Sequence, residues 1–194
     1  MAPHRLHRSI IPDRSPDEKE LGISVELQYG FHHKKAIDRN LTPYTEAVIC
    51  EIQRLGNIAP TSIFHRTLSE VKLSNYKIPP DTLIIPMIGD IMHDPEYFHE
   101  PLKFNPDRYL IQDENGKLKF QSDPRVIPFG TGKRRCLGEQ LARTTIYKFF
   151  TAIVQKYEII SGQDEPIEDK YTPGFTRMPK TFKLIFKPRK HKVV

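Results

Sequence analysis

Residues 129–138 read Phe-Gly-Thr-Gly-Lys-Arg-Arg-Cys-Leu-Gly, and they are the most informative part of the chain. They place Cys136 in a glycine- and arginine-rich turn directly before an amphipathic segment that predicts a helix. A helix N-terminus and nearby cations both favour the thiolate form of a cysteine. The setting of Cys136 therefore suits a sulfur that acts as an anion, for example as a metal ligand.

The spacing Phe-x-x-Gly-x-Arg-x-Cys-x-Gly in these residues closely resembles the haem-binding loop of the cytochrome P-450 monooxygenases. Five fixed positions would coincide on the order of once in 10⁷ registers, so chance is a poor explanation. The resemblance implies that Cys136 is the axial ligand of the haem iron. It also implies that Arg134 pairs with a haem propionate and that Phe129 shields the thiolate. Gly132 and Gly138 would allow backbone turns and close approach that a side chain would block.

Two other interpretations of the Cys136 loop are weaker. A lone cysteine is usually a small buried hydrophobe, but the three cations at 133–135 argue against a purely apolar setting. Gly132 and the lysine after it could belong to a phosphate-binding loop. That motif needs a glycine where Ile127 stands and a serine or threonine where Arg134 stands.

The segment from Thr42 to Gly56 predicts an α-helix. Thr42 is the expected N-cap, Pro43 suits the first helical position, and Gly56 suits the C-terminal stop. Four apolar residues recur at spacings of four, four and three, which predicts one buried face: Tyr44, Val48, Ile52 and Leu55.

Glu51 and Arg54 stand three residues apart on this expected helix, where they can pair on one face. On their own they would be an ordinary surface pair of little energetic weight. They precede the segment Phe-Asn-Pro-Asp-Arg-Tyr at 104–109 and then Cys136, in the order found in the monooxygenase family. The resemblance implies that Arg108 joins the pair in a buried triad behind the haem, which would fix the loop that presents the sulfur.

The same resemblance assigns further residues to the haem and to the substrate. His65 stands where microsomal members of the family offer a histidine or arginine to a haem propionate. Residues 60–64 and 174–178 match substrate-facing segments, so four side chains are expected to face an apolar substrate: Ile63, Phe64, Phe175 and Thr176. Their mixed apolar and hydroxyl character also fits an ordinary core strand, and that alternative stays open.

Shorter patterns predict the remaining elements. Strands are expected at 64–71, 75–78, 82–87 and 180–187. Asp94 is the expected cap of a short helix, and a second long helix follows Cys136. The predicted buried stripe of that helix consists of Leu141, Thr145, Phe149 and Ile153. The predicted fold class is mainly α with small β-sheets, and the resemblance implies a truncated cytochrome P-450 fold, namely its proximal haem-binding half.

The chain of 194 residues carries a formal charge of +6 and two cysteines, Cys50 and Cys136, which form no disulfide framework. Residues 1–37 lack a sustained helical or strand period and are predicted to be a disordered extension that does not match the family. Residues 38–194 are the expected cytochrome P-450 C-terminal region. No apolar run is long enough to span a membrane, and no secretory signal begins the chain. The resemblance implies the cytosolic face of the endoplasmic reticulum membrane for the family; without the N-terminal anchor, a cytosolic location is the alternative.

The resemblance implies a haem-thiolate monooxygenase, an oxidoreductase that inserts one oxygen atom from O₂ into an apolar organic substrate. Its cofactor is haem (iron protoporphyrin), and its electrons come from NADPH through the NADPH-cytochrome reductase. Lys133 and Arg135 are hypothesised to attract the acidic face of that reductase. No catalytic residue beyond the haem ligand is predicted.

Full members of the family also have an upstream helix that crosses the distal haem face with an acid–threonine pair. No such stretch is found in this sequence. The alternative function is therefore a catalytically inactive haem- or reductase-binding fragment without the distal oxygen-activating helix. A nucleic-acid binder is not favoured, because no aromatic-and-basic motif supports it.

Overall fold

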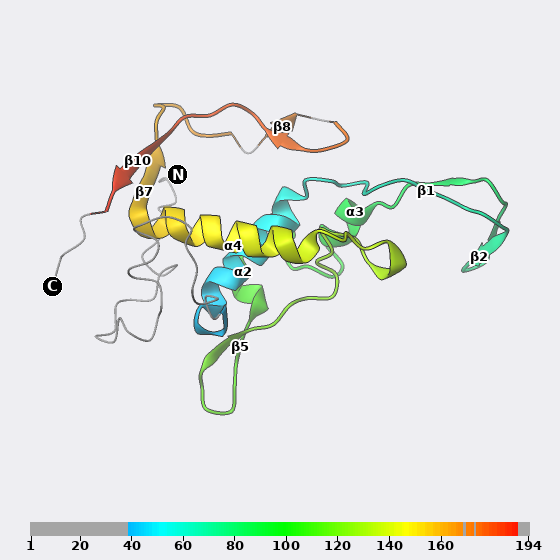
Figure 1. Ribbon diagram of the computed structural model, residues 1–194, viewed down its shortest axis with the longest axis horizontal. Helices are drawn as coiled ribbons and strands as arrows, with labels where there is room; N and C mark the ends of the chain where they lie inside the picture. Colours follow the sequence, from blue (N-terminus) through cyan, green and yellow to red (C-terminus); the bar gives the residue numbers. More distant parts are fainter. Residues whose placement is uncertain (1–38, 169, 173, 190–194) are drawn as a thin grey trace.

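The computed structural model describes residues 39–168, 170–172 and 174–189 (Figure 1). The two long helices, α2 (Pro43–Gly56) and α4 (Glu139–Lys156), contact each other near the centre. The segment that carries β1 (His65–Arg66) and β2 (Val71–Leu73) extends to one side of the helices in Figure 1. On the other side, β7 (Tyr157–Ser161) continues from the C-terminal end of α4. The predicted extension, residues 1–37, lies outside the described residues.

Helix α2 begins where the sequence predicts, with Thr42 before it and Pro43 in its first turn. The Thr42 side chain makes no capping bond to the helix and instead hydrogen-bonds the Tyr147 hydroxyl of α4. The helix is closed by Asn57 rather than by Gly56. Asn57 adopts the left-handed conformation (φ 38°) and its N–H donates to the Gln53 carbonyl. Asparagine tolerates this conformation better than most residues, so it can close a helix as glycine does.

The predicted buried face of α2 is wrong in part. Val48 is buried, but Ile52 is 45% exposed. The buried residues of the helix include three polar ones and are Thr45, Ala47, Val48, Ile49, Cys50, Glu51 and Arg54. The reason is that a 3₁₀ turn, η4 (Pro106–Tyr109), and the hairpin of β5 (Leu110–Gln112) and β6 (Leu118–Phe120) cover the side that carries the charges. There Ala47, Cys50 and Tyr109 form a small core.

The described strands pair into five antiparallel two-stranded sheets. The pairs are β1 (His65–Arg66) with β4 (Leu83–Ile84), β2 (Val71–Leu73) with β3 (Tyr76–Ile78), β5 (Leu110–Gln112) with β6 (Leu118–Phe120), β7 (Tyr157–Ser161) with β10 (Leu184–Pro188), and β8 (Tyr171–Thr172) with β9 (Met178–Pro179). The strand predicted at 64–71 is therefore split. Thr67 interrupts it, because its hydroxyl donates to the Pro79 carbonyl and accepts from the Thr82 N–H.

The short helix predicted to start at Asp94 is wrong. A five-residue helix, α3 (Ile88–Met92), precedes that position. Asp94 instead stabilises a turn, in which its Oδ1 accepts the Glu96 N–H at 2.9 Å. Gly89 within α3 packs so closely on α2 that a Cβ would lie 2.3 Å from the Asn57 amide nitrogen. Close packing rather than helix propensity therefore places α3, which a propensity pattern cannot anticipate.

Helix α4 also buries a different face from the predicted one. Leu141 and Phe149 are 74% and 51% exposed, whereas Tyr147, Thr151 and Val154 are buried. Both faces carry apolar residues, and the face that meets α2 is the buried one. Among the described residues, no helix is long and apolar enough to cross a membrane. The few helices and small antiparallel sheets agree in coarse form with the predicted fold class.

Candidate functional site

The loop around Cys136 is a compact turn that ends at α4. Gly130 and Gly132 adopt φ of 72° and 68°, which residues with a side chain rarely adopt. A 3₁₀ turn, η5 (Gly132–Arg134), follows, and the Cys136 N–H donates to the Phe129 carbonyl at 2.9 Å. This bond closes the loop and leaves the Cys136 thiol free and exposed. A Cβ on Gly138 would lie 3.8 Å from the sulfur, so the backbone there passes close to it.

The three cations of this loop differ in their partners. Arg135 forms a two-pronged ion pair with Glu139 at the start of α4, with 2.7 Å between Arg135 Nη2 and Glu139 Oε1. Lys133 and Arg134 are exposed and have no hydrogen-bond or ion-pair partner among the described residues. A cation free to meet an anionic ligand therefore lies two residues from the exposed thiol.

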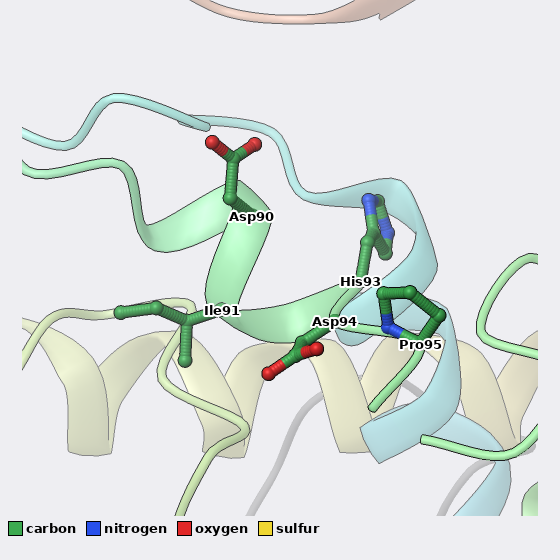
Figure 2. Close-up of a pocket in the computed structure, with 5 residues that line it drawn as sticks. All are labelled: Asp90, Ile91, His93, Asp94 and Pro95. Atoms are coloured by element: carbon green, nitrogen blue, oxygen red, sulfur yellow. The ribbon is translucent and has the colours of Figure 1, made fainter. Parts of the chain in front are cut away.

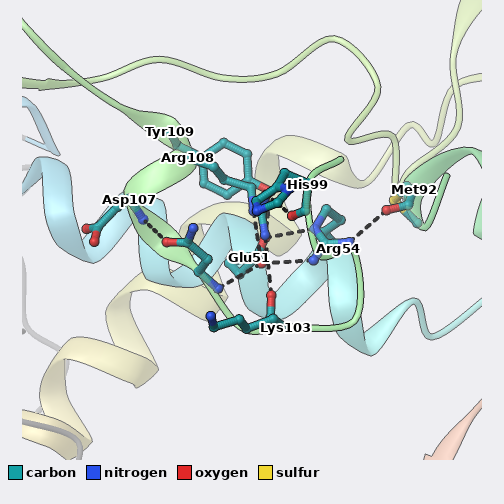
Figure 3. Close-up of polar contacts among 9 residues, drawn as sticks. Glu51, Arg54, Met92, His99, Lys103, Asp107, Arg108 and Tyr109 are labelled. Atoms are coloured by element: carbon teal, nitrogen blue, oxygen red, sulfur yellow. Dashed lines mark hydrogen bonds and ion pairs between the residues drawn. The ribbon is translucent and has the colours of Figure 1, made fainter. Parts of the chain in front are cut away.

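Glu51 and Arg54 of α2 are brought together with Arg108 of η4 (Figure 3). Arg54 donates from Nε to Glu51 Oε2 at 2.8 Å and from Nη2 to Glu51 Oε1 at 2.9 Å. Arg108 Nε donates to Glu51 Oε1 at 3.2 Å. The side chains of Glu51 and Arg54 are 0% exposed and that of Arg108 is 12% exposed. The three charges thus form one buried cluster.

Two groups that sequence reasoning missed complete the Glu51 cluster. The Tyr109 hydroxyl donates to Glu51 Oε2 at 2.7 Å, and the Asn105 N–H donates to Glu51 Oε1 at 3.0 Å. Arg54 also donates to the Met92 carbonyl at 2.8 Å, which ties α3 to the cluster. Both Tyr109 and Asn105 flank the predicted Arg108, so their closeness in sequence was the available signal.

The electrostatics of the cluster keep its pair charged. Burial alone would raise the pKa of Glu51, but hydrogen bonds from Arg54, Asn105 and Tyr109 lower it below its ordinary value of 4.5. Burial would lower the pKa of Arg54, and Glu51 raises it instead. Burial, Cys50 and Glu51 raise the pKa of Tyr109, so the phenol stays neutral. A charged pair with every acceptor oxygen used makes a rigid support.

The predicted substrate-facing segments contact each other. The rings of Phe64 and Phe175 pack edge to face with centroids 5.8 Å apart, and the Arg177 N–H donates to the Ile58 carbonyl at 2.7 Å. Phe64 and Phe175 are partly exposed, at 44% and 57%. The segment before Phe64 also reaches the cysteine loop, since the Ser62 hydroxyl lies 4.0 Å from a Cβ built on Gly130.

Among the residues that the structure describes, no hydrogen bond or ion pair brings the other residues predicted around the haem and substrate into contact with the cysteine loop or with each other. Ile63 is 73% exposed. Thr176 is also exposed, and its side chain makes no hydrogen bond within the described ranges. His65 is half-buried in β1 opposite Ile84, and the described residues offer its side chain no hydrogen-bond partner. No ion pair or hydrogen bond joins His65 to Arg134 in the described part of the chain.

A depression of about 530 Å³ lies beside α3 (Figure 2). Its lining consists of Asp90, Ile91, His93, Asp94 and Pro95. His93 is half-buried, and its burial together with Arg54 and Arg177 lowers its pKa. No residue of the predicted haem or substrate site lines this depression, so it is separate from them.

Glu139 and Arg143 of α4 were also missed by sequence reasoning. Arg143 Nε donates to Glu139 Oε1 at 2.7 Å, and Arg143 lies over the Phe129 ring with 5.2 Å from its Cζ to the ring centroid. The signal was present in the spacing, because Arg135, Glu139 and Arg143 are four residues apart, the separation at which charges pair on a helix.

The profile of the cytochrome P450 family matches residues 29–186 of the chain. Cytochrome P450 2B2 of Rattus norvegicus is 38% identical over 169 residues, which cover 85% of this chain and 33% of that protein. Cytochrome P450 2A6 of Homo sapiens is 37% identical over 155 residues, or 78% of this chain and 30% of the relative. A 3-ketosteroid oxygenase of Caenorhabditis elegans is 40% identical over 145 residues, which cover 74% of this chain and 25% of that protein. The chain thus spans a third or less of the length of these relatives.

Proposed function

Because this chain belongs to the cytochrome P450 family, we propose that it is the proximal haem-binding part of a haem-thiolate monooxygenase. The observation that carries the proposal is the exposed Cys136 thiol, set in the family spacing beside Arg134, which has no partner among the described residues. A thiolate donor, a nearby cation and a backbone that passes close to the sulfur suit an anionic, flat iron porphyrin.

Different residues in and near the loop would contact different parts of the haem. Cys136 would be the axial iron ligand, and Arg134 and His65 would meet the propionates. Phe129 would shield the sulfur. Gly132 adopts the positive φ of the turn, and the backbone at Gly138 passes near the sulfur. Haem, when bound, supplies the chemistry by which O₂ is activated for insertion into an apolar substrate.

Glu51, Arg54 and Arg108 would act as the structural support of that site. Helix α2 carries this cluster on one side and reaches α4 on the other, where Arg143 Nη1 donates to Gln53 Oε1 at 3.2 Å. A rigid α2 therefore restrains the start of α4, which follows Cys136 directly. We assign the cluster a positioning role, with no contact to the reacting atoms.

The proposal also covers the residues that would meet the substrate and the electron donor. Ile63, Phe64, Phe175 and Thr176 would contribute to the apolar substrate surface, supported by the contact between Phe64 and Phe175. Electrons would come from NADPH through a reductase whose acidic face meets Lys133, which is exposed and unpartnered among the described residues. Arg135 is less suited to that role than the sequence suggests, because Glu139 already neutralises it. The cytosolic face of the endoplasmic reticulum membrane is the location proposed from the family.

A second function is a haem- or reductase-binding chain without turnover. The exposed Cys136 thiol and the exposed Lys133 beside it would serve haem or reductase binding whether or not a substrate is oxidised. The two functions share the Cys136 site and differ only in whether substrate is oxidised.

The test is the difference spectrum of the reduced carbon-monoxide complex of the haem-loaded chain. A red-shifted, thiolate-type band is expected for the wild type and for Cys50→Ala, since Cys50 is buried in the core with Tyr109. The band should be lost in Cys136→Ala. An unchanged band in Cys136→Ala would overturn the assignment of the ligand. Product formation with reductase and NADPH would then decide between the monooxygenase and the non-catalytic chain.

A further inference from the structure

The two ends of the cysteine loop are held by one carboxylate. At the C-terminal end, Arg135 pairs with Glu139 through two nitrogens. At the N-terminal end, the Phe129 ring lies under the guanidinium of Arg143, which also pairs with Glu139 at 2.7 Å. Cys136 directly follows Arg135, and its N–H donates to the Phe129 carbonyl, so the sulfur-bearing residue is joined to both held residues.

Glu139 is well placed for this double contact. It occupies the first position of α4, and its side chain is only 9% exposed. Its Oε1 accepts from Arg135 Nη2 and from Arg143 Nε, both at 2.7 Å. Hydrogen bonding to Arg135 lowers the pKa of Glu139, which is therefore ionised at neutral pH.

The contact with Arg143 extends beyond α4. Arg143 Nη1 donates to Gln53 of α2, and the Arg143 carbonyl accepts from Arg39 Nη2 at 2.8 Å. A shift of Glu139 would therefore be opposed by two other segments of the chain. The loop is in this way fixed to the same helix that carries the Glu51 cluster.

We propose that Glu139 is a positioning residue, which clamps both ends of the 129–138 loop through Arg135 and Arg143 and so fixes the direction of the Cys136 sulfur. The Arg143 arm is the stronger one, because the Arg143 side chain is 31% exposed and that of Arg135 is 61% exposed. Exposed ion pairs are weakened by solvent. The contacts of the clamp do not depend on the proposed haem-thiolate function. Only the purpose of the positioned sulfur, which is to bind haem iron, rests on that proposed function.

The first test needs no haem. Hydrogen exchange of the Arg135 and Cys136 amides is measured in the full chain, since both amides are bonded within the loop. In Glu139→Gln their exchange should rise about tenfold, as expected for loss of a hydrogen bond to a charged group. The exchange of α2 amides should stay unchanged. No rise, or an equal rise in α2, would overturn the clamp.

Two comparisons sharpen this test. Glu168→Gln is the matched control, because Glu168 also lies between two cations, Lys170 and Lys180, at 3.2 and 3.1 Å. It should leave loop exchange at the wild-type rate. Arg143→Gln should raise loop exchange more than Arg135→Gln does, and the reverse order would contradict the assignment of the stronger arm.

The second test is spectroscopic and separates the clamp from the proposed function. In the haem-loaded chain, Glu139→Gln should lower the thiolate-type fraction of the reduced carbon-monoxide complex, and Glu139→Asp, which keeps the charge, should restore part of it. An unchanged fraction in Glu139→Gln would overturn the role in directing the sulfur. If the wild type itself gives no thiolate-type band, the proposed function fails, while the exchange result still decides whether the clamp exists.

Discussion

Glu51→Gln would remove one negative charge from the interior and leave two cations behind. Both carboxylate oxygens of Glu51 are in use. Oε1 accepts from Arg54, Arg108 and Asn105, and Oε2 accepts from Arg54 and Tyr109. The glutamine side chain has one acceptor oxygen and one NH₂ group. Its NH₂ group must therefore face the donors that bind either Oε1 or Oε2 in the wild type. Turning the NH₂ toward the Oε2 side sacrifices the fewer hydrogen bonds, which are two.

The cost follows from burial. Glu51 and Arg54 are 0% exposed, so solvent does not reduce the penalty for an unpaired Arg54. Breaking a buried, hydrogen-bonded ion pair lowers the free energy of unfolding by about 3–5 kcal/mol. Total stabilities of domains are about 5–15 kcal/mol, so this single change should remove a large part of the total.

Urea unfolding at pH 7, followed by far-ultraviolet circular dichroism, measures the effect. We expect a lower midpoint with an unchanged m-value. Glu114→Gln, in the exposed β5–β6 turn, is the control and should change stability by less than about 0.5 kcal/mol. A loss of less than about 1 kcal/mol in Glu51→Gln, the range of exposed pairs, would refute the reasoning because Arg54 would then be solvated.

The same variant has a pH signature. The folded-state pKa of Glu51 lies below its ordinary value of 4.5, so its contribution to stability is fully present above pH 4.5. The contribution is lost as the pH falls through the folded-state pKa. The stability difference between wild type and Glu51→Gln should therefore be largest at neutral pH and shrink in acid. A difference that stays constant down to the acid limit of folding would contradict the lowered pKa.

Three further outcomes are expected. Tyr109→Phe removes a buried hydroxyl that donates to a carboxylate, so it should lower the free energy of unfolding by about 1.5–3 kcal/mol in urea; an unchanged midpoint would contradict that bond. Gly132→Ala should cost about 1–2 kcal/mol because of its φ of 68°, whereas Gly56→Ala, at a helical position with open space around it, should stabilise by about 0.4–1 kcal/mol; equal effects would refute the strain argument. A water-soluble maleimide at neutral pH should label the exposed Cys136 quickly and Cys50 only after unfolding, because burial raises the pKa of Cys50 to about 12; mass spectrometry that finds equal rates would contradict this burial.

Local patterns predicted the positions of the long helices better than their buried faces. Pro43 and the turn around Gly56 set the limits of α2 within a residue. The periodicity of Tyr44, Val48, Ile52 and Leu55 could not reveal that charged residues are the more buried side. That outcome depends on η4, whose partners lie more than fifty residues away in sequence.

The candidate site shows the same division. The spacing around Cys136 identified the loop, and the order of motifs anticipated that Glu51, Arg54 and Arg108 meet. Glu139 was overlooked, although its spacing to two arginines is regular, because a charge pair on a helix is usually a surface feature. The burial of Glu139 and the contact between Arg143 and Phe129 distinguish this one, and both require the folded loop.

The buried ion pair of α2 also constrains the order of events during synthesis. The partners of Glu51 outside its own helix, Asn105, Arg108 and Tyr109, follow it by 54 to 58 residues. At about 5–20 residues per second, a ribosome takes about 3–12 s to make that interval. Without that segment, burial of Glu51 would leave hydrogen-bond positions on its oxygens unfilled, which is costly. Burial of this face of α2 is therefore favourable only once the segment that completes it has been translated.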